Sequence, residues 1–342
     1  MGVKGQLRRI AAGVVGGLGM GRRIAGWLDC HAAILAYHRV LDPERHDVEA
    51  VEPGMFVTRE TFAAHVELLQ QRFRVVSLSD LVRKHLTGEP VESGTVAVTF
   101  DDAWLDTYEV AHPLLRAAGL PATVFVPTAL VDDGHRFWFS HAAAATKNLW
   151  EMRDSLAAAF PEENVPATAA FLVDLLVSNP PRTEYFQAIL GELKELSDAQ
   201  RTEVITFIEA VTEKKIELPP ELASWEQLRQ MHAEGWEIGS HTVGHHILTQ
   251  LSAAEVKHEL DGSKRVIERE IGESPTNFCY PNGNYDEHTK RAVQRAGYAC
   301  AVTTEAGFAD PPADLFALPR LGVHQGVAAT ANGLELLLSG LG

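Results

Sequence analysis

Short apolar runs alternate with amphipathic segments along most of the chain. Runs rich in β-branched and aromatic residues predict buried strands over 32–38, 74–78, 94–100, 121–127, 236–241, 276–281, 298–303 and 318–324. Helical spacing of apolar positions predicts helices between them, over 58–73, 79–86, 107–119, 224–235, 252–272 and 286–297. Strands that alternate with helices in this way are typical of a parallel sheet covered by helices.

The alternation stops between residues 134 and 220. This segment is rich in Ala, Leu and Glu, and it predicts consecutive helices over 138–150, 167–178, 183–196 and 198–215. The alternation of strands and helices resumes after it. We therefore expect 134–220 to be a helical insertion within a domain made of 31–133 and 221–330, with 1–30 as a separate N-terminal segment.

The predicted elements favour one α/β architecture over another. About seven core strands, each followed by a helix, predict a distorted or incomplete (β/α)7 barrel, and a doubly wound open sheet is the alternative. No G-x-G-x-x-G or P-loop motif follows a predicted strand, so the sequence does not support a nucleotide cofactor.

Composition and charge argue against some kinds of binding partner. The 342 residues include 46 acidic and 30 basic ones, and the net charge of −16 argues against nucleic-acid binding. Three cysteines, with no CxxC pair, indicate neither a disulfide framework nor a cysteine zinc site and suit a reducing compartment.

The N-terminal segment 1–30 differs from the rest. Five basic residues against one acidic residue give the first 29 residues a charge of +4, around a Gly-rich apolar stretch too short to span a bilayer. We expect either peripheral contact with an anionic membrane surface or an ordinary N-terminal helix or arm. No clear cleavage site follows, so a cytoplasmic or membrane-peripheral location is favoured over secretion.

Two adjacent carboxylates follow the predicted strand 94–100. Asp101 and Asp102 stand where the chain leaves the strand, at the end that carries functional groups in parallel architectures. Repulsion between them would raise the pKa of one unless a cation neutralises the pair. A metal ion would explain the pair, and a helix cap with a solvated neighbour is the alternative.

Two histidines follow the predicted strand 236–241. His241 ends the strand and His245 comes four residues later, a spacing at which both imidazoles can bind one ion, while His246 is expected to point elsewhere. Two unrelated core or surface histidines are the alternative for such a spacing alone. Together with a carboxylate at another strand end, the pattern favours a metal site.

These motifs resemble those of the polysaccharide deacetylases of the NodB-homology group. The segments "ILAYHRV", "TFDD", "SHTVGH" and "NFCYPNGNYDE" occur in the family's order, and the likeness covers about Ala33 to Val327 apart from the insertion. The resemblance implies a barrel of the polysaccharide deacetylase type with Asp102, His241 and His245 as metal ligands and Asp101 as general base. One carboxylate and two imidazoles suit a divalent ion, with Zn²⁺ expected.

The chain departs from the commonest family pattern in the groove motif. That motif usually begins R-x-P, with the arginine orienting the catalytic aspartate, whereas this chain has Cys279, Tyr280 and Pro281. Arg320, on a later predicted strand, is expected to supply the arginine, as in the exopolysaccharide-associated branch that "YPNG" resembles. His324 is the candidate general acid, with an ordinary rim histidine as the alternative.

Three further residues are candidate substrate contacts. His38 ends the first predicted strand, and the alternative is a core histidine bonded to the backbone. Trp104 lies near the aspartates and is expected either to stack on a sugar or to pack against the next helix. Tyr280 is expected at the site, with a backbone N–H near it donating to the oxyanion of the reaction.

The resemblance implies a metal-dependent hydrolase that removes N-acetyl groups from an amino-sugar glycan. The same water-activating site would serve O-deacetylation, or deacylation of a small or lipid-linked sugar, so the motifs leave these alternatives open. A third alternative is a non-catalytic glycan-binding protein. Such proteins typically lose a ligand or the base, whereas Asp101, Asp102, His241 and His245 are all present.

Overall fold

The computed structural model forms two compact units. It describes residues 32–48, 51, 54–131, 137–159, 165–216 and 221–340, so the basic segment 1–30 and its expected membrane contact lie outside the described residues. Of the described residues, the first unit takes those within Met1–Arg45, Pro53–Gly134 and Leu222–Gly342, and the second takes those within His46–Glu52 and His135–Glu221.

Seven parallel strands form a closed ring in the first unit. Around the ring they follow the order β1 (Ala33–Tyr37), β10 (Leu318–Gly322), β9 (Cys300–Ala306), β8 (Asn277–Cys279), β7 (Glu237–Ser240), β6 (Thr123–Val126) and β5 (Thr95–Phe100). Pairing of β1 with β5, from Ala33 opposite Val96 to Tyr37 opposite Phe100, closes the ring. The predicted seven-stranded barrel is confirmed, and the open sheet is excluded.

Three further strands, each of three residues, lie outside this ring. β4 (Arg74–Val76) pairs with the first half of β5. A separate parallel pair, β2 (Arg39–Leu41) and β3 (Phe56–Thr58), was not predicted from the sequence.

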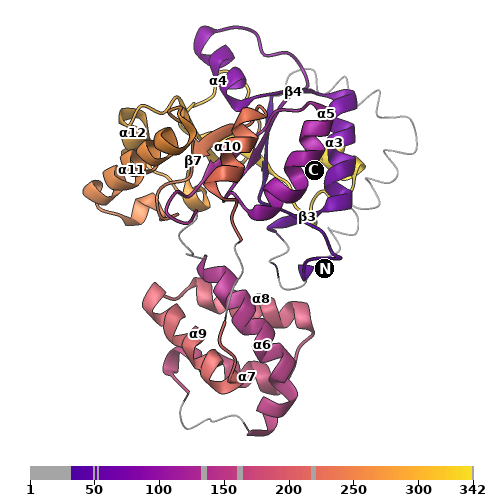
Figure 1. Cartoon of the computed structure of the whole chain (residues 1–342), viewed down its shortest axis with the longest axis vertical. Helices are drawn as coiled ribbons and strands as arrows, with labels where there is room; N and C mark the ends of the chain where they lie inside the picture. The colour runs from indigo at the N-terminus through magenta and orange to yellow at the C-terminus, as the bar shows by residue number, and fades with distance from the viewer. Residues whose placement is uncertain are drawn as a thin grey trace. The chain divides into compact units, whose positions relative to one another are not determined.

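Helices cover the outside of the ring. In Figure 1 the helices α11 and α12 lie on one side of the strands and α3 and α5 on the other. A capping box formed by Ser252 and Glu255 begins α11. The α-helices among the described residues of this unit are α3 (Arg59–Arg72), α4 (Leu78–Thr87), α5 (His112–Ala118), α10 (Trp225–Ala233), α11 (Ala253–Ile271), α12 (Glu287–Arg295) and α13 (Ala331–Leu338).

Alternation along the strands separates two sets of buried side chains. On β5, Val96, Val98 and Phe100 pack in the large cluster that includes the surrounding helices. Ala97, between them, belongs to a second cluster with Cys279 of β8 and Leu318 of β10. Thr99 and Asp101 continue the second set, so Asp101 lies on the same side of the chain as Cys279.

Helices also make up the second unit, where the sequence predicted them: α6 (Trp138–Ala159), α7 (Phe171–Ser178), α8 (Arg182–Lys194) and α9 (Asp198–Thr212). Arg182 donates to both carboxylate oxygens of Asp47, at 3.1 and 2.6 Å. The helices of this unit share a hydrophobic core that includes Leu149, Leu172, Tyr185, Ile189, Leu193, Val204 and Ile208.

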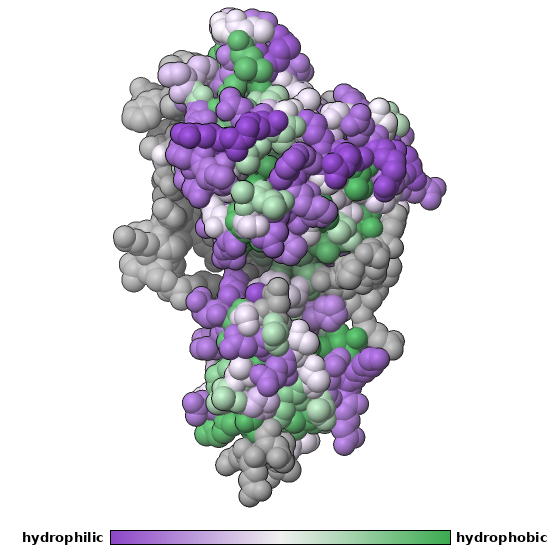
Figure 2. Space-filling model, turned by 90° about the vertical axis from the view of Figure 1, so that its left-hand side faces the viewer, coloured by the Kyte–Doolittle hydropathy of each residue, from purple (hydrophilic) through white to green (hydrophobic). Residues whose placement is uncertain are grey.

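One face of the molecule is seen to be mainly polar where its residues are coloured (Figure 2). On the face shown in Figure 2, hydrophilic residues cover most of it, and hydrophobic residues lie between them in small groups. Among the helices of the described residues, none combines the length and the apolar character needed to span a bilayer.

Candidate active site

Asp101 is held at the end of β5 by a buried arginine. Its backbone N–H donates to the carbonyl of Tyr37 at 3.0 Å, which fixes the main chain as it leaves the strand. Arg320 of β10 donates from Nη1 to Oδ1 at 2.8 Å and from Nη2 to Oδ2 at 2.7 Å. This paired geometry fixes the plane of the carboxylate as well as its position.

The guanidinium of Arg320 has an acceptor for each of its five N–H groups. Besides Asp101, it donates from Nη1 to Thr99 Oγ1 at 3.0 Å and from Nε to the Thr303 carbonyl at 2.8 Å. Nη2 also lies 3.3 Å from the Cys279 sulfur. Arg320 is only 1% exposed, and residues of the barrel wall supply the hydrogen-bond acceptors for its buried charge.

The ion pair with Arg320 determines the charge of Asp101. Burial alone would raise the pKa of its carboxyl, but the charge and hydrogen bonds of Arg320 outweigh burial and lower the pKa to about 2. His38 Nε2, 3.8 Å from Asp101 Oδ2, adds to this effect. Asp101 is consequently ionised across the physiological range.

Asp102 lies in a turn of unusual backbone conformation. Its φ is 72° and that of Ala103 is 56°, the left-handed region that L-residues rarely adopt. The Ala103 carbonyl accepts a hydrogen bond from the N–H of Ala223 at 2.9 Å, and Trp104 forms an isolated bridge with Leu222. These contacts hold the turn that carries Asp102.

One oxygen of Asp102 is bonded and the other is not. Trp104 donates from Nε1 to Oδ2 at 3.1 Å, whereas the buried Oδ1 has no hydrogen-bond partner. Oδ1 lies 3.5 Å from His241 Nε2 and 3.3 Å from His245 Nε2. Burial would raise the pKa of Asp102, but its interactions with the two histidines hold that pKa well below the usual value.

The imidazole of His241 is oriented from behind. Nδ1 lies 2.8 Å from the carbonyl of Cys279, and because a carbonyl only accepts, Nδ1 carries the proton. Nε2 is then the nitrogen that faces Asp102. Such a carbonyl contact is the usual arrangement behind a metal-binding histidine.

Asp102, His241 and His245 form a candidate Asp/His metal site. Their three ligand atoms all lie within 4.8 Å of one another, and the two imidazole rings are 4.7 Å apart at 76°. An orphaned buried oxygen facing two imidazole nitrogens fits a divalent cation.

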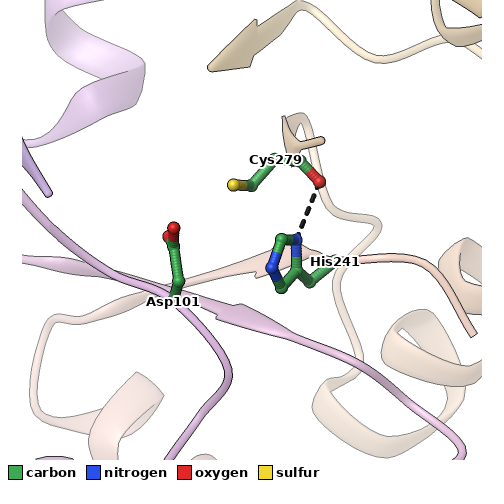
Figure 3. A group of neighbouring side chains, drawn as sticks. All are labelled: Asp101, His241 and Cys279. Atoms are coloured by element: carbon green, nitrogen blue, oxygen red, sulfur yellow. Dashed lines mark hydrogen bonds between the residues drawn. The ribbon is translucent and has the colours of Figure 1, made fainter. Parts of the chain in front are cut away.

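A second cluster of possible ligands has a different character. Asp101, His241 and Cys279 also lie within 4.8 Å of one another, and Figure 3 shows the Cys279 carbonyl directed at His241 and its thiol on the side of Asp101. The Arg320 guanidinium contacts both Asp101 and the thiol, so a second cation there would be repelled. Burial also raises the pKa of the Cys279 thiol, which keeps it protonated.

The histidines predicted at the mouth of the barrel are both accessible in part. The His38 side chain is 25% exposed and faces Asp101. His324 follows β10, is half-buried, and accepts a hydrogen bond from the N–H of Gly326 at 3.2 Å. Among the described residues, no hydrogen bond or ion pair joins His324 to Asp101 or to Asp102.

Two expected substrate contacts are corrected by the structure. Trp104 is 1% exposed and uses its N–H on Asp102, so its ring is not available to stack on a sugar. Tyr280 is fully buried, and its hydroxyl donates to the Phe316 carbonyl at 3.0 Å. Its backbone N–H donates to the carbonyl of Val302 at 3.2 Å, so it is not free for an oxyanion.

Glu259 of α11 was not singled out from the sequence. It is 5% exposed and contacts the loop between the two histidines. The available signal was a charged residue among the mainly apolar buried positions of α11, which include Val256, Leu260 and Ile267.

The fold and the site together define a parallel (β/α) barrel protein with a candidate divalent-metal site at the carboxyl ends of its strands. Residues 88–301 match the family model described as Polysaccharide deacetylase, which is more than half of the chain. The chain therefore belongs to the polysaccharide deacetylase family.

Individual proteins share part of the sequence or the fold of this chain. YxkH of Bacillus subtilis (strain 168) is 34% identical over 108 residues, which are 32% of this chain and 39% of YxkH, so the match spans well under half of that relative. The Streptococcus pyogenes deacetylase PplD in complex with acetate superposes with a TM-score of 0.59 at 18% identity, covering 90% of this chain and 98% of PplD. IcaB from Ammonifex degensii gives 0.56 at 17% identity, covering 92% and 98%. These likenesses establish the fold.

Proposed function

We propose that this chain is a metal-dependent hydrolase that removes N-acetyl groups from an amino-sugar polysaccharide of the exopolysaccharide type. The observation that carries the proposal is the juxtaposition of two differently held carboxylates. Asp101 is paired with Arg320, and Asp102 faces two imidazole nitrogens. PplD, which shares the fold, is a deacetylase whose structure holds acetate, the product expected here.

Asp102, His241 and His245 would hold the divalent ion, with Zn²⁺ expected from one carboxylate and two imidazoles. When bound, this ion lowers the pKa of water and polarises the acetyl carbonyl. Trp104 keeps Asp102 Oδ2 occupied, so that Oδ1 is the oxygen offered to the ion.

Asp101 is the proposed general base. The paired N–H groups of Arg320 hold both of its oxygens in one plane and keep the carboxylate ionised, so it is always ready to accept a proton. The same pairing makes Asp101 a weaker base, because a pKa near 2 favours the ionised form. Positioning rather than basicity is thus the main contribution of the pair.

His324 is the proposed general acid, and His38 would contact substrate beside Asp101. Burial and the neighbouring His38 lower the pKa of His324, so its protonated form gives up a proton readily to the leaving amine. Both residues follow the carboxyl ends of adjacent strands, β1 and β10.

Acetate release from a panel of N-acetylated and O-acetylated glycans tests the proposal. We expect release from N-acetylated amino-sugar oligomers, its loss on chelation and its return with Zn²⁺. Asp101→Asn should abolish release while Zn²⁺ still binds. Full activity of Asp101→Asn would exclude the base assignment, and release only from O-acetylated glycans would exclude the N-deacetylase assignment.

A further inference from the structure

The backbone between His241 and His245 is held by a carboxylate on a neighbouring helix. Glu259 Oε2 accepts hydrogen bonds from the backbone N–H groups of Val243 at 2.8 Å and Gly244 at 2.9 Å. Its other oxygen, Oε1, lies 3.1 Å from His246 Nδ1. One buried side chain therefore contacts three residues of the loop that carries the histidines.

Helix α11 approaches the loop closely around this contact. A Cβ built on Gly262 would lie 2.8 Å from Val243 Cγ2, so a side chain at position 262 would force Val243 or the helix to shift. One residue on, Ser263 Oγ lies 2.7 Å from Ser240 Oγ at the end of β7. Residues 259, 262 and 263 share one face of the helix, and that face fits the strand end and the loop.

The loop also depends on contacts from its other side. The carbonyls of Thr242 and Val243 accept hydrogen bonds from the N–H groups of Thr128 at 3.1 Å and Ala129 at 2.8 Å. The N–H groups that point the opposite way are the ones bound by Glu259. The loop is therefore held by hydrogen bonds on both sides, and Glu259 accepts those on one side.

This support matters because the loop has an unfavourable backbone conformation. Thr242 has a φ of 70° and His245 a φ of 59°, values that residues with side chains adopt only when their surroundings impose them. The φ of His245 also decides where its imidazole points. A loop released at Val243 and Gly244 would relax toward ordinary backbone angles and turn His245 away from Asp102.

We propose that Glu259 is a positioning residue of the metal site. It sets the loop conformation that brings His245 Nε2 to within 3.3 Å of Asp102 Oδ1. The inference rests on the proposed metal-binding role of His241 and His245. It assigns to α11 a part in metal affinity that none of the sequence motifs indicates.

The hydrogen bonds of Glu259 predict how strongly each substitution should disturb the loop. Glu259→Ala removes all three contacts and leaves two loop amides without an acceptor. Glu259→Gln keeps one acceptor oxygen for those amides but places an NH₂ group opposite His246, so it should retain part of the effect. Asp261→Asn is the matched control, because Asp261 lies on the same helix, carries the same charge, and pairs with Lys257 instead.

The experiment measures Zn²⁺ affinity of the intact chain by competition with a chromophoric chelator, together with amide hydrogen exchange. We expect Glu259→Ala to weaken Zn²⁺ binding by about 10- to 100-fold, and to accelerate exchange in the loop 242–246 without accelerating it in β7. Glu259→Gln should show a smaller change in both readouts, and Asp261→Asn should match the unmodified chain.

Unchanged Zn²⁺ affinity in Glu259→Ala would overturn the inference. So would faster exchange throughout α11 and β7, since that would indicate general destabilisation. If Glu259→Ala does not fold, the comparison of Glu259→Gln with Asp261→Asn decides, and equal affinities reject the role. Because Zn²⁺ affinity is measured without substrate, a chain whose Zn²⁺ affinity depends on Glu259 but that releases no acetate would refute only the proposed function.

Discussion

Replacing Arg320 by Met should destabilise the barrel in a way that depends on pH. The fall in the pKa of Asp101 from 3.8 to about 2 corresponds to about 2.4 kcal/mol of folding free energy at about 1.36 kcal/mol per pKa unit. Removing the partner also leaves a carboxylate with 3% exposure unpaired. Loss of one member of a buried pair typically costs about 3–5 kcal/mol in total, which is our expected loss at pH 7.

The sign of the pH dependence follows from the two pKa values. In the unmodified chain Asp101 has a depressed pKa, so its stabilising contribution is complete above about pH 4 and is lost as the pH falls toward 2. In Arg320→Met burial dominates and raises the pKa of Asp101, so protonation relieves the unpaired charge at a higher pH. The difference between the two chains should therefore shrink from pH 7 to pH 4.

Urea unfolding of the chelated protein, followed by tryptophan fluorescence at several pH values, measures this difference. Trp104, Trp225 and Trp236 report on the barrel unit, whose transition is fitted separately from that of the helical unit. Arg229→Met is the matched control, since Arg229 makes an exposed pair with Glu270 and should cost at most about 1 kcal/mol. A loss below about 1 kcal/mol for Arg320→Met, or one equal at pH 4 and pH 7, would refute the reasoning.

Three other predictions concern the site. If His324 is the general acid, kcat/KM falls as the pH rises through the lowered pKa of His324, which gives the pH–rate profile a falling alkaline limb. His324→Asn should remove that limb and lower kcat by about 10²-fold or more. His38→Asn should shift the same limb to higher pH, because the charge of His38 lowers the pKa of His324; an unmoved limb would contradict this. Trp104→Phe should weaken Zn²⁺ binding by about tenfold, since Asp102 Oδ2 loses its donor, and chelator competition would show it.

Sequence patterns were most informative about the strands and their ends. Apolar runs predicted the ring strands, and the topology places the ends of parallel strands together, so Asp101 and His241 were expected at one mouth. Their catalytic and metal-binding roles stay predictions until activity and metal affinity are measured.

Side-chain direction could not be obtained from the pattern. Trp104 and Tyr280 stand next to site residues in the sequence, yet both are buried, because neighbours along a turning chain can point to different sides. Glu259 was missed for the opposite reason, since it is distant in sequence and meets the histidine loop only through the packing of α11 on β7.

The position of β10 in the ring has a consequence for synthesis of the chain. This strand lies between β1 and β9 and carries Arg320, which pairs with Asp101 across 219 residues of sequence. A nascent chain that has emerged only as far as β9 lacks both the closing strand and the cation that its buried aspartate needs. Folding from the N-terminus can therefore proceed through the earlier strands but cannot complete the barrel. The barrel is completed and Asp101 gains its partner in the same late step, so an incomplete product would have both an open sheet edge and an unpaired buried carboxylate.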